Sequence, residues 1–581
     1  MAVAVVEPEV DDDVVDPGEP RPHPITRRVV DVLAALLIFV ALVLPNDLTR
    51  LKPGALLTLP AEGLVAAGLL LLLPTMARRI VGTILGAALG VILLLKLMDM
   101  GFGEALGRPF NPMVDWSLLG DGLHFLQGWL GRVGALGAVA IAVLLTAALP
   151  ILIALAARRL AGRIDGHPVI TTRAVVVLAI IWVGCAVPGA HLVRGVPVAG
   201  SATAFLFDRA SHLSQDLQDR KAFAAEAAND TFRSVPAQDL LTALRGKDVV
   251  LTFVESYGRS AIEDPGLAPG INAVLDAGSR KLAAAGFASR SAFLTSPTAG
   301  GGSWLAHSTL LSGLWIDNNQ RDRDLVESDR FTLTNAFQRA GWRTVGIMPG
   351  NVTPWLDGAR FGYDKIYSAD DLGYRGPKFS WAPMPDQYAF AAFERLEHSA
   401  KARSAARKSS AAESAPPRGG LMAEVVTVSS HAPWSPIPRP VSWRDVGDGS
   451  VFDSMSSKAY PPEAILTRDR GRVRADYQRS IAYSLNTLIS YVQTYGDDDM
   501  VLIFLGDHQP SPIVTGQGAS HDVPITIVAR DRTVLDRIAD WGWQPGVKPS
   551  ANAPVWRMDT FRDRFLTAFG PQPGTQPVGR H

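Results

Sequence analysis

The first 200 residues of the chain carry long apolar runs, and the remainder carries short ones. Five of the long runs are each close to the roughly 20 residues that a helix needs to cross a lipid bilayer. They cover Val29–Pro45, Leu56–Met76, Ile80–Leu97, Val133–Ala157 and Ala174–Val193. This pattern predicts an α-helical membrane domain of five transmembrane helices over residues 28–195.

From residue 246 to residue 570, short apolar runs typical of buried strands alternate with segments of helical periodicity. The strand-like runs are Lys247–Val254, Ser291–Leu294, Thr344–Met348, Glu424–Val428, Met500–Leu505 and Ile525–Val528. The helical segments are Ile271–Ala285, Trp304–Leu311, Thr332–Ala340, Gln387–His398 and Ala475–Tyr495. Strands that alternate with helices predict an α/β domain with a mostly parallel central sheet and helices on both faces.

The segments outside these two domains do not have the composition of a packed core. Residues 1–27 are acidic and rich in proline, and residues 571–581 are rich in proline and glycine, so both are predicted to be disordered tails. Residues 399–420 are rich in serine, alanine and proline and are expected to form a surface insertion. Residues 196–245 are amphipathic and are predicted to be a juxtamembrane helical linker.

Positive charges in the short loops predict how the chain is oriented in the membrane. Arg27 and Arg28 precede the first apolar run, Arg78 and Arg79 separate the second from the third, and three further arginines follow the fourth. With five spans all of them lie on one side, which the positive-inside rule makes the cytoplasmic side. The domain after residue 200 is then expected outside the cytoplasm, in a multi-pass protein of the cell membrane.

The overall composition argues against several classes of protein. Lys plus Arg and Asp plus Glu are equal, at 56 each, which gives no support to nucleic-acid binding, because such proteins carry a basic excess. The single cysteine, Cys185, lies in an apolar run. Disulfides, zinc ribbons and CxxC redox motifs are therefore excluded.

Acidic and imidazole side chains follow two of the predicted strands. Glu255 comes directly after the run 247–254, and Asp507 and His508 follow the run 500–505. In open α/β sheets, active groups collect at the carboxyl ends of strands. Two carboxylates and an imidazole suit Zn²⁺ or Mn²⁺, with Mg²⁺ as a further candidate for the divalent ion. The structural alternatives are that the carboxylate caps a helix and that the Asp-His pair forms a surface turn.

A glycine run and a serine follow a third strand-like run. Gly300, Gly301 and Gly302 would let the backbone approach a ligand closely, and Ser303 stands where a helix begins. The free amides and the positive dipole end of a helix N-terminus favour an anion, and a metal could activate the hydroxyl. This layout predicts the transfer of a phosphoryl or sulfuryl group. The alternative is that Ser303 only caps its helix.

Four other residues are candidates for contact with a substrate. His431 follows the run 424–428 in the sequence SSHAPW, and His521 just precedes the run 525–528. Trp355 and Arg360 belong to the loop NVTPWLDGARFGYDKIY, which could line a pocket. For each of the four, the alternative is a structural role. His307, on the helix after the glycine run, is expected to pack against the rest of the domain.

The motifs VVLTFVESYGRS, the glycine-rich turn with Ser303, FGYDKIY, SSHAPW and FLGDHQP occur in this order. In this order they resemble the sulfatase-type branch of the alkaline phosphatase superfamily. Five membrane spans before an extracytoplasmic domain are similar to the plan of the lipoteichoic acid synthases and of the phosphoethanolamine transferases. The resemblance covers residues 245–570 and the number of spans.

The resemblance implies roles for particular residues. Glu255, Ser303, Asp507 and His508 take the positions of the metal ligands, and Ser303 also takes that of the nucleophile that becomes covalently phosphorylated. His431 and His521 take the positions of substrate-binding histidines.

Three departures from the pattern of these enzymes bear on the substrate. The synthases and ethanolamine transferases usually have threonine as the nucleophile, and Ser303 keeps the hydroxyl. The synthases place an arginine closely after a tryptophan in the glycerol-phosphate pocket, whereas here Trp355 is followed by Leu356 and Asp357, with Arg360 the nearest cation. Residues 296–298 do not fit the motif at which sulfatases form formylglycine, which disfavours hydrolysis of a sulfate ester.

The function that the sequence predicts is that of a membrane-anchored, metal-dependent transferase. It would move a phospho-alcohol group, of the phosphoglycerol or phosphoethanolamine type, from a lipid headgroup to Ser303. The group would then pass to a cell-envelope glycan, to a lipid or to water. Two alternatives are a sulfatase or phosphodiesterase that only hydrolyses its ester, and an inactive domain that binds polyanions as a sensor or transporter.

Overall fold

The computed structural model describes most of the chain, in two compact units. The described residues are 24–51, 58–106, 109–111, 115–166, 168–186, 191–193, 196–197, 199–200, 218–351, 355–399, 420–434, 437–458 and 468–571. One unit comprises residues 1–97 and 137–208, and the other comprises residues 98–136 and 209–581. Most of both predicted tails and of the predicted insertion, and residues 201–217 of the predicted linker, lie outside the described residues.

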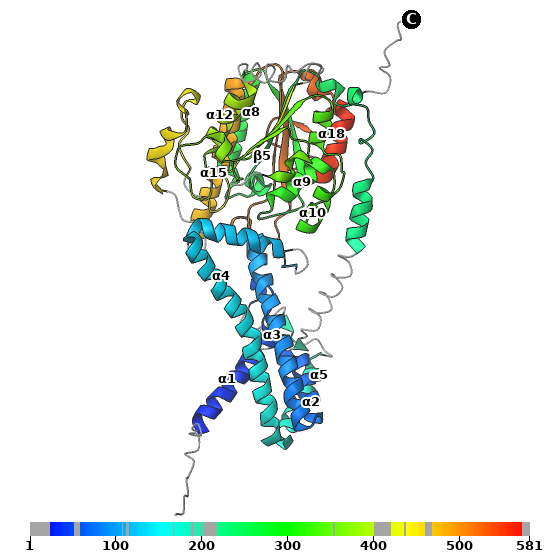
Figure 1. Cartoon of the computed structure of the whole chain (residues 1–581), viewed down its shortest axis with the longest axis vertical. Coiled ribbons are helices and arrows are strands. Elements are labelled where there is room, and N and C mark those ends of the chain that lie inside the picture. Colours follow the sequence, from blue (N-terminus) through cyan, green and yellow to red (C-terminus); the bar gives the residue numbers. More distant parts are fainter. Residues whose placement is uncertain are drawn as a thin grey trace, which may run out of the picture. The chain divides into compact units, whose positions relative to one another are not determined.

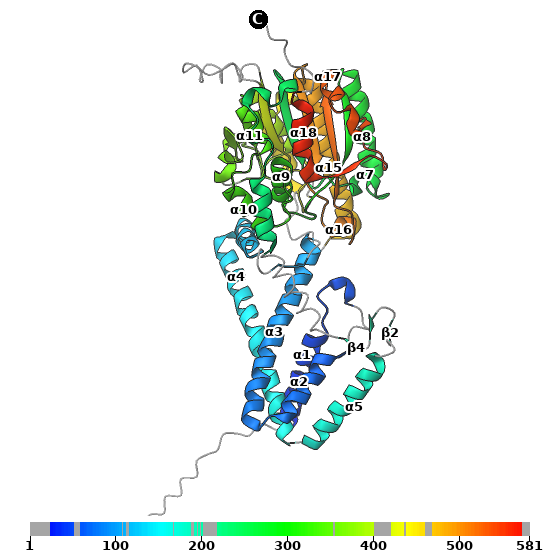
Figure 2. The same cartoon turned by 90° about the vertical axis from the view of Figure 1, so that its right-hand side faces the viewer.

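Five helices overlap the five long apolar runs of the sequence (Figure 2). They are α1 (Pro24–Val43), α2 (Ala61–Leu72), α3 (Thr75–Leu106), α4 (Trp116–Arg163) and α5 (Pro168–Ala186). Three segments are long and apolar enough to cross a membrane: Thr75–Gly103, Gly131–Gly166 and Pro168–Ala186. Three of the five predicted transmembrane helices, α3, α4 and α5, therefore contain segments of suitable length and composition, and the assignment of α1 and α2 as membrane spans stays a prediction.

Charge and length distinguish α1 and α2 from the other three helices. The α1 helix carries Arg27, Arg28 and Asp31 in its first two turns. The α2 helix has 12 residues, which at about 1.5 Å per residue is shorter than the roughly 30 Å of a bilayer core. It ends because Pro74 follows, and a residue before proline is driven from the helical to the extended region. Leu73 accordingly has φ −92° and ψ 145°.

Glycines bring α3 and α4 into close contact. Gly82, Gly86 and Gly90 recur every fourth residue on α3. A Cβ atom added to Gly86 would lie 2.8 Å from the Cα of Ala154, and one added to Gly90 would lie 2.4 Å from the Cα of Pro150. Small residues at this spacing let two helix backbones pack directly against each other in a membrane. Short strands complete this unit: β1 (Leu59–Pro60) pairs with β4 (Ala199–Gly200), and β2 (His191–Val193) pairs with β3 (Val196–Pro197).

A nine-stranded sheet organises the second unit. Its strands are β5 (Asp248–Val254), β6 (Ala288–Thr295), β7 (Arg343–Ile347), β8 (Lys365–Tyr367), β9 (Leu421–Val426), β10 (Met500–Gly506), β11 (Asp522–Ala529), β12 (Gln544–Pro545) and β13 (Val555–Arg557). Their order is β12-β6-β11-β10-β5-β9-β7-β8, with β13 beside β6. All six predicted strands are present.

The sheet is mixed, with five parallel and three antiparallel pairings between neighbouring strands. The strands β10, β5, β9, β7 and β8 run parallel, whereas β11 is antiparallel to both β10 and β6, and β12 is antiparallel to β6. A parallel neighbour needs a crossover connection, usually a long helix. Between β10 and β11 there is only the four-residue helix α16 (Pro512–Thr515), so the chain turns back antiparallel.

Helices cover both faces of this sheet, as predicted (Figure 1). On one face lie α9 (Ser303–Ser312), α10 (Asn319–Glu327), α11 (Leu333–Arg339), α17 (Arg532–Asp536) and α18 (Phe561–Phe569). On the other lie α7 (Ser260–Glu263), α8 (Ala268–Ala284), α12 (Asp386–Phe393) and α15 (Arg470–Tyr495). Each face of the sheet packs a hydrophobic core against its helices, because successive side chains of a strand point to opposite faces. In β5, Leu251 and Phe253 lie in the core of the first face, and Val250 and Val254 lie in that of the second.

The described end of the predicted linker packs against the first face of the sheet. Phe223, Leu240 and Leu244 are buried in the same core as α9 and α18. From residue 218 onward, the chain therefore contributes to the folded α/β unit.

Candidate metal centre

The register of two neighbouring strands brings the predicted metal ligands together. β5 and β10 are parallel, and Val254 pairs with Gly506. Glu255 and Asp507 are the next residues, so they leave the sheet at the same edge. A glycine is required at position 506, because an added Cβ would lie 1.8 Å from the backbone oxygen of Tyr257.

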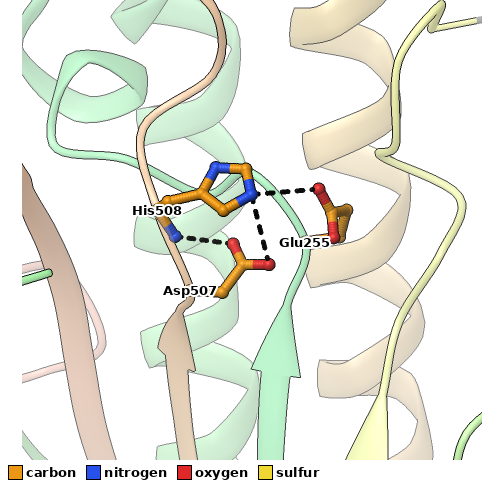
Figure 3. A group of neighbouring side chains, drawn as sticks. All are labelled: Glu255, Asp507 and His508. Carbon is orange, nitrogen blue, oxygen red and sulfur yellow. Dashed lines mark hydrogen bonds and ion pairs between the residues drawn. The ribbon is translucent and has the colours of Figure 1, made fainter. Parts of the chain in front are cut away.

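Glu255, Asp507 and His508 form a compact buried cluster (Figure 3). One ligand atom from each can be chosen so that all lie within 4.8 Å of one another. The Nε2 atom of His508 is 3.6 Å from Oε1 of Glu255 and 3.7 Å from Oδ2 of Asp507. The three residues are 5%, 0% and 1% exposed, in the order Glu255, Asp507, His508. Burial of the Asp-His pair excludes its interpretation as a surface turn.

Backbone amides and hydroxyls orient the two carboxylates. Oδ1 of Asp507 accepts hydrogen bonds from the amides of Ser256 and His508, both at 2.7 Å. Oε1 of Glu255 accepts one from the hydroxyl of Ser256 at 2.7 Å. Ser256 reaches both acids because its backbone has φ +57°, a left-handed conformation that is uncommon for a residue with a side chain.

The two carboxylates have opposite pKa shifts. Burial, together with the negative charge of Glu255, raises the pKa of Asp507 well above its ordinary value. Burial also opposes ionisation of Glu255, but the imidazoles of His431 and His508 and the hydrogen bond from Ser256 outweigh it and lower the pKa of Glu255. Two like charges this close in a buried site repel each other, and a bound cation would relieve that repulsion.

The residues present fit a divalent metal ion. Oδ2 of Asp507 is buried and accepts no hydrogen bond from any residue that the structure describes. A metal ion would satisfy such an atom, and two carboxylates with an imidazole are the donors that Zn²⁺ and Mn²⁺ accept. Glu255, Asp507 and His508 would hold the ion.

Ser303 joins this cluster as the sequence predicts. Its Oγ donates a hydrogen bond to Oε2 of Glu255 at 3.0 Å and lies 3.2 Å from Nε2 of His508. It is the first residue of α9, and the helix N-cap is Gly302 at φ +77°. The amides of the first turn and the hydroxyl therefore lie at the same end of the helix, beside the two acids.

The glycine-rich loop before Ser303 is attached to the loop that carries the metal ligands. The hydroxyl of Ser296 donates to the backbone oxygen of Asp507 at 2.6 Å, and the amide of Gly300 donates to that of Gln509 at 2.8 Å. Gly300 and Gly301 have φ values of +77° and +155°, which other residues rarely adopt. The loop thus holds the start of α9 in place relative to Asp507.

His431 lies near the cluster. Its imidazole is close enough to Glu255 to lower the pKa of that acid, and it stacks on Trp381 with ring centroids 3.7 Å apart. The turn that carries His431 is anchored by Asp386, which is fully buried and accepts hydrogen bonds from the amides of Val428 and Ser429. A role for His431 in substrate binding stays a prediction that this position favours.

The structure does not bring the other three predicted substrate residues into the cluster. The His521 side chain is exposed, and its backbone oxygen accepts from the amide of Ser296. Trp355 packs on Phe361 with ring centroids 5.0 Å apart, and the exposed Arg360 donates to the backbone oxygen of Val326 at 3.1 Å. Substrate roles for His521, Trp355 and Arg360 stay predictions.

A polar network on α9 was not predicted from the sequence. His307 stacks on Phe253, as expected of a packing residue, but its Nδ1 also lies 2.9 Å from Oε1 of Glu424. The other oxygen of Glu424 accepts a hydrogen bond from the hydroxyl of Tyr363. A charged residue inside the apolar strand LMAEVV was the available signal. His307 also opposes the pKa rise of Asp507, so the network contributes to the electrostatics of the cluster.

Comparisons with known proteins give structural neighbours but no family assignment. No family model and no curated protein matches the chain. Among solved structures, the chain is similar to the lipoteichoic acid synthase LtaP from Listeria monocytogenes, at 13% identity over 61% of this chain and 78% of that one, with a TM-score of 0.35.

Two further solved structures are similar to the chain at the same distance. The C-terminal periplasmic domain of EptC from Escherichia coli has 14% identity, covers 56% of this chain and 82% of that one, and has a TM-score of 0.35. The phosphoglycerol transferase GacH from Streptococcus pyogenes has 12% identity, covers 60% of this chain and 90% of that one, and has a TM-score of 0.33. Similarity this distant assigns no activity to the chain.

Proposed function

We propose that the protein is a membrane-anchored, metal-dependent transferase that moves a phospho-alcohol group from a lipid headgroup, through Ser303, to an acceptor of the cell envelope. One observation carries the proposal. The Ser303 hydroxyl, at a helix N-terminus, lies within hydrogen-bond distance of both Glu255 and His508 in a buried cluster. Such a hydroxyl can attack phosphorus while nearby amides and cationic groups stabilise the charge that develops.

In the first step, Ser303 Oγ attacks the phosphorus of the lipid phosphodiester. A bond forms between Oγ and phosphorus, and the bond from phosphorus to the diacylglycerol oxygen breaks. The hydroxyl proton leaves toward Oε2 of Glu255, which already accepts its hydrogen bond at 3.0 Å, and the diacylglycerol oxygen takes a proton from solvent. When bound, a divalent ion supplies a Lewis acid that lowers the pKa of the hydroxyl and neutralises the phosphoryl oxygens.

In the second step, a hydroxyl of the acceptor attacks the same phosphorus and releases Ser303 Oγ, which recovers a proton. The acceptor is a glycan or lipid of the envelope, and water in its place gives hydrolysis. The free amides at the start of α9 would donate hydrogen bonds to the phosphoryl oxygens in both steps. In this proposal His431, which stacks on Trp381, contacts the group that is transferred.

The donor can be identified by measuring diacylglycerol release from defined lipids. The purified full-length protein is given phosphatidylethanolamine, phosphatidylglycerol or phosphatidylcholine together with Mn²⁺ or Zn²⁺. We expect diacylglycerol from phosphatidylethanolamine and poor release from phosphatidylglycerol, because the Trp–Arg pair of the synthases is interrupted at Leu356. Release that a chelator does not stop would contradict metal dependence. Phospho-alcohol recovered only in solution, with and without an acceptor lipid, would favour the hydrolase.

The proposed donor requires the α/β unit to lie outside the cytoplasm, which cysteine labelling can test. The chain has one cysteine, so Cys185→Ala provides a cysteine-free background. Lys281→Cys on the exposed surface of α8 should react with a membrane-impermeant maleimide in intact cells. Arg28→Cys, at the exposed start of α1, should react only after lysis, because arginine-rich ends stay in the cytoplasm. The reverse labelling pattern would overturn the orientation.

A further inference from the structure

The helical unit of residues 1–97 and 137–208 contains a cavity of about 630 Å³ that is lined mainly by arginines. They are Arg27 of α1, Arg79 of α3, and Arg158, Arg159 and Arg163 of α4. All five belong to the unit formed by residues 1–97 and 137–208, and none is part of the metal centre. The proposed transferase chemistry leaves this cavity unexplained.

The cavity holds more positive charge than the surrounding side chains neutralise. Asp31 pairs with Arg159 at 2.7 Å and with Arg163 at 2.8 Å. In the part of the chain that the structure describes, no carboxylate pairs with Arg27, Arg79 or Arg158. Among the described residues, five guanidinium groups against one carboxylate leave a surplus of four positive charges. Like charges gathered in one cavity repel each other, and an anion among them would remove that cost.

Helix packing holds these charges together. The contact of Gly82 and Gly86 with α4 sets the separation of α3 and α4 at this end. A Cβ atom added to Gly162 would lie 3.5 Å from Nε of Arg79, so that guanidinium group lies directly against α4. Arg159 also donates to the backbone oxygen of Arg27 at 3.2 Å, which brings α1 to the same place. The cavity is thus formed by three helices whose arginines converge.

The position of the cavity identifies the kind of anion. Arg79 lies near one end of a segment long enough to cross a membrane, and Arg158 lies near the end of another. The apolar side chains of Val30 and Leu155 also line the cavity. Beyond them, α3 and α4 expose large apolar side chains, namely Ile80, Ile84, Ile151 and Leu152, each 55–61% exposed. A ligand with a phosphate at the end of apolar chains matches both surfaces.

We propose that this cavity binds the phosphate headgroup of an anionic membrane phospholipid, with its acyl chains along the apolar surfaces of α3 and α4. Arginine suits this task because its planar guanidinium group binds phosphate through two parallel hydrogen bonds. Basic pockets between transmembrane helices bind such headgroups in membrane proteins generally. The bound lipid links α1, α3 and α4, since its phosphate can bridge Arg27, Arg79 and Arg158.

Native mass spectrometry of the full-length protein in detergent tests the proposal. Cardiolipin, phosphatidylglycerol and phosphatidylcholine are titrated against the wild type and against Arg79→Gln/Arg158→Gln. We expect the wild type to bind one anionic lipid in preference to phosphatidylcholine. The double variant should bind it about 30-fold more weakly, at about 1 kcal/mol for each arginine lost.

A matched control distinguishes lipid binding in the cavity from attraction of the lipid by exposed positive charges. Arg28→Gln/Arg173→Gln removes two exposed arginines that do not line the cavity, and it should bind the lipid like the wild type. Arg158→Lys keeps the charge and the fold but loses the two-pronged hydrogen bond, so intermediate binding is expected. Equal losses in the two double variants would show nonspecific attraction and overturn the proposal. Inorganic phosphate or pyrophosphate that displaces the lipid at equal concentration would assign the cavity to a soluble anion instead.

Discussion

Replacing Ser303 by alanine is expected to reduce diacylglycerol release by about three orders of magnitude or more. Losing the nucleophile removes the covalent route entirely, and comparable deletions elsewhere have effects of this size. The change should leave the fold intact, because the hydrogen bonds of the Ser303 side chain to described residues go to Glu255 and His508, and its helix is capped by a glycine. Release of diacylglycerol from the donor lipid, followed by liquid chromatography, measures the effect.

Three further measurements show whether Ser303 acts as a nucleophile or only as a helix residue. Ser303→Thr should keep part of the activity, since it supplies the same oxygen. Ser308→Ala, on the same helix but bonded to Asp322, should be nearly as active as the wild type. Wild type exposed to donor lipid without acceptor should gain the mass of the phospho-alcohol group on the peptide with Ser303. An active Ser303→Ala variant, with no adduct on the wild type, would refute the mechanism.

Asp507→Asn is expected to abolish tight metal binding. The substitution removes the negative charge of a proposed metal ligand. Oδ2 of the Asp507 carboxylate has no hydrogen-bond partner among the described residues. Loss of residues that only support metal ligands typically costs 10–100-fold in affinity, so loss of a ligand should cost at least about 100-fold. Metal content by elemental analysis, and affinity by titration with Mn²⁺ and Zn²⁺, provide the measurement.

Stability of the metal-free protein separates a ligand from a structural acid. Asp507 lies buried beside a second carboxylate, so removing its charge should leave the metal-free protein at least as stable as the wild type. Asp522→Asn is the matched control: its carboxylate also lies at this sheet edge but binds Arg259 and Thr295, and it should keep the metal. Stoichiometric metal in purified Asp507→Asn would show that the ligand assignment is wrong.

The sequence predicted the α/β unit well because its signals are local. All six expected strands and the helices between them are present, and Glu255, Asp507 and Ser303 meet where strand ends were expected to place them. Those predictions needed only the apolar runs and the rule that the carboxyl ends of parallel strands lie at the same edge of a sheet. The antiparallel course of β11 was missed because a short connection with one helical turn resembles a loop in sequence.

Features that depend on distant partners could not be predicted. His307 meets Glu424 across more than 100 positions, and His431 stacks on Trp381 from another loop. Neither contact has a spacing in the sequence that would reveal it. In the unit of residues 1–97 and 137–208, apolar runs suggested five spans, whereas three segments meet the length and composition of a membrane span, because α2 ends before Pro74 and α1 starts with charged residues.

The pairing of β5 with β10 has a consequence for how the protein is made. Ser256 and Asp507 hydrogen bond across 251 positions, so the ribosome must complete most of the chain before the cluster can form. Contacts between residues this far apart form late, because closing so long a loop costs entropy before any contact repays it. Shorter products of interrupted synthesis would carry Glu255 and Ser303 but no metal site. Binding of a metal ion by this cluster would therefore require a nearly complete chain.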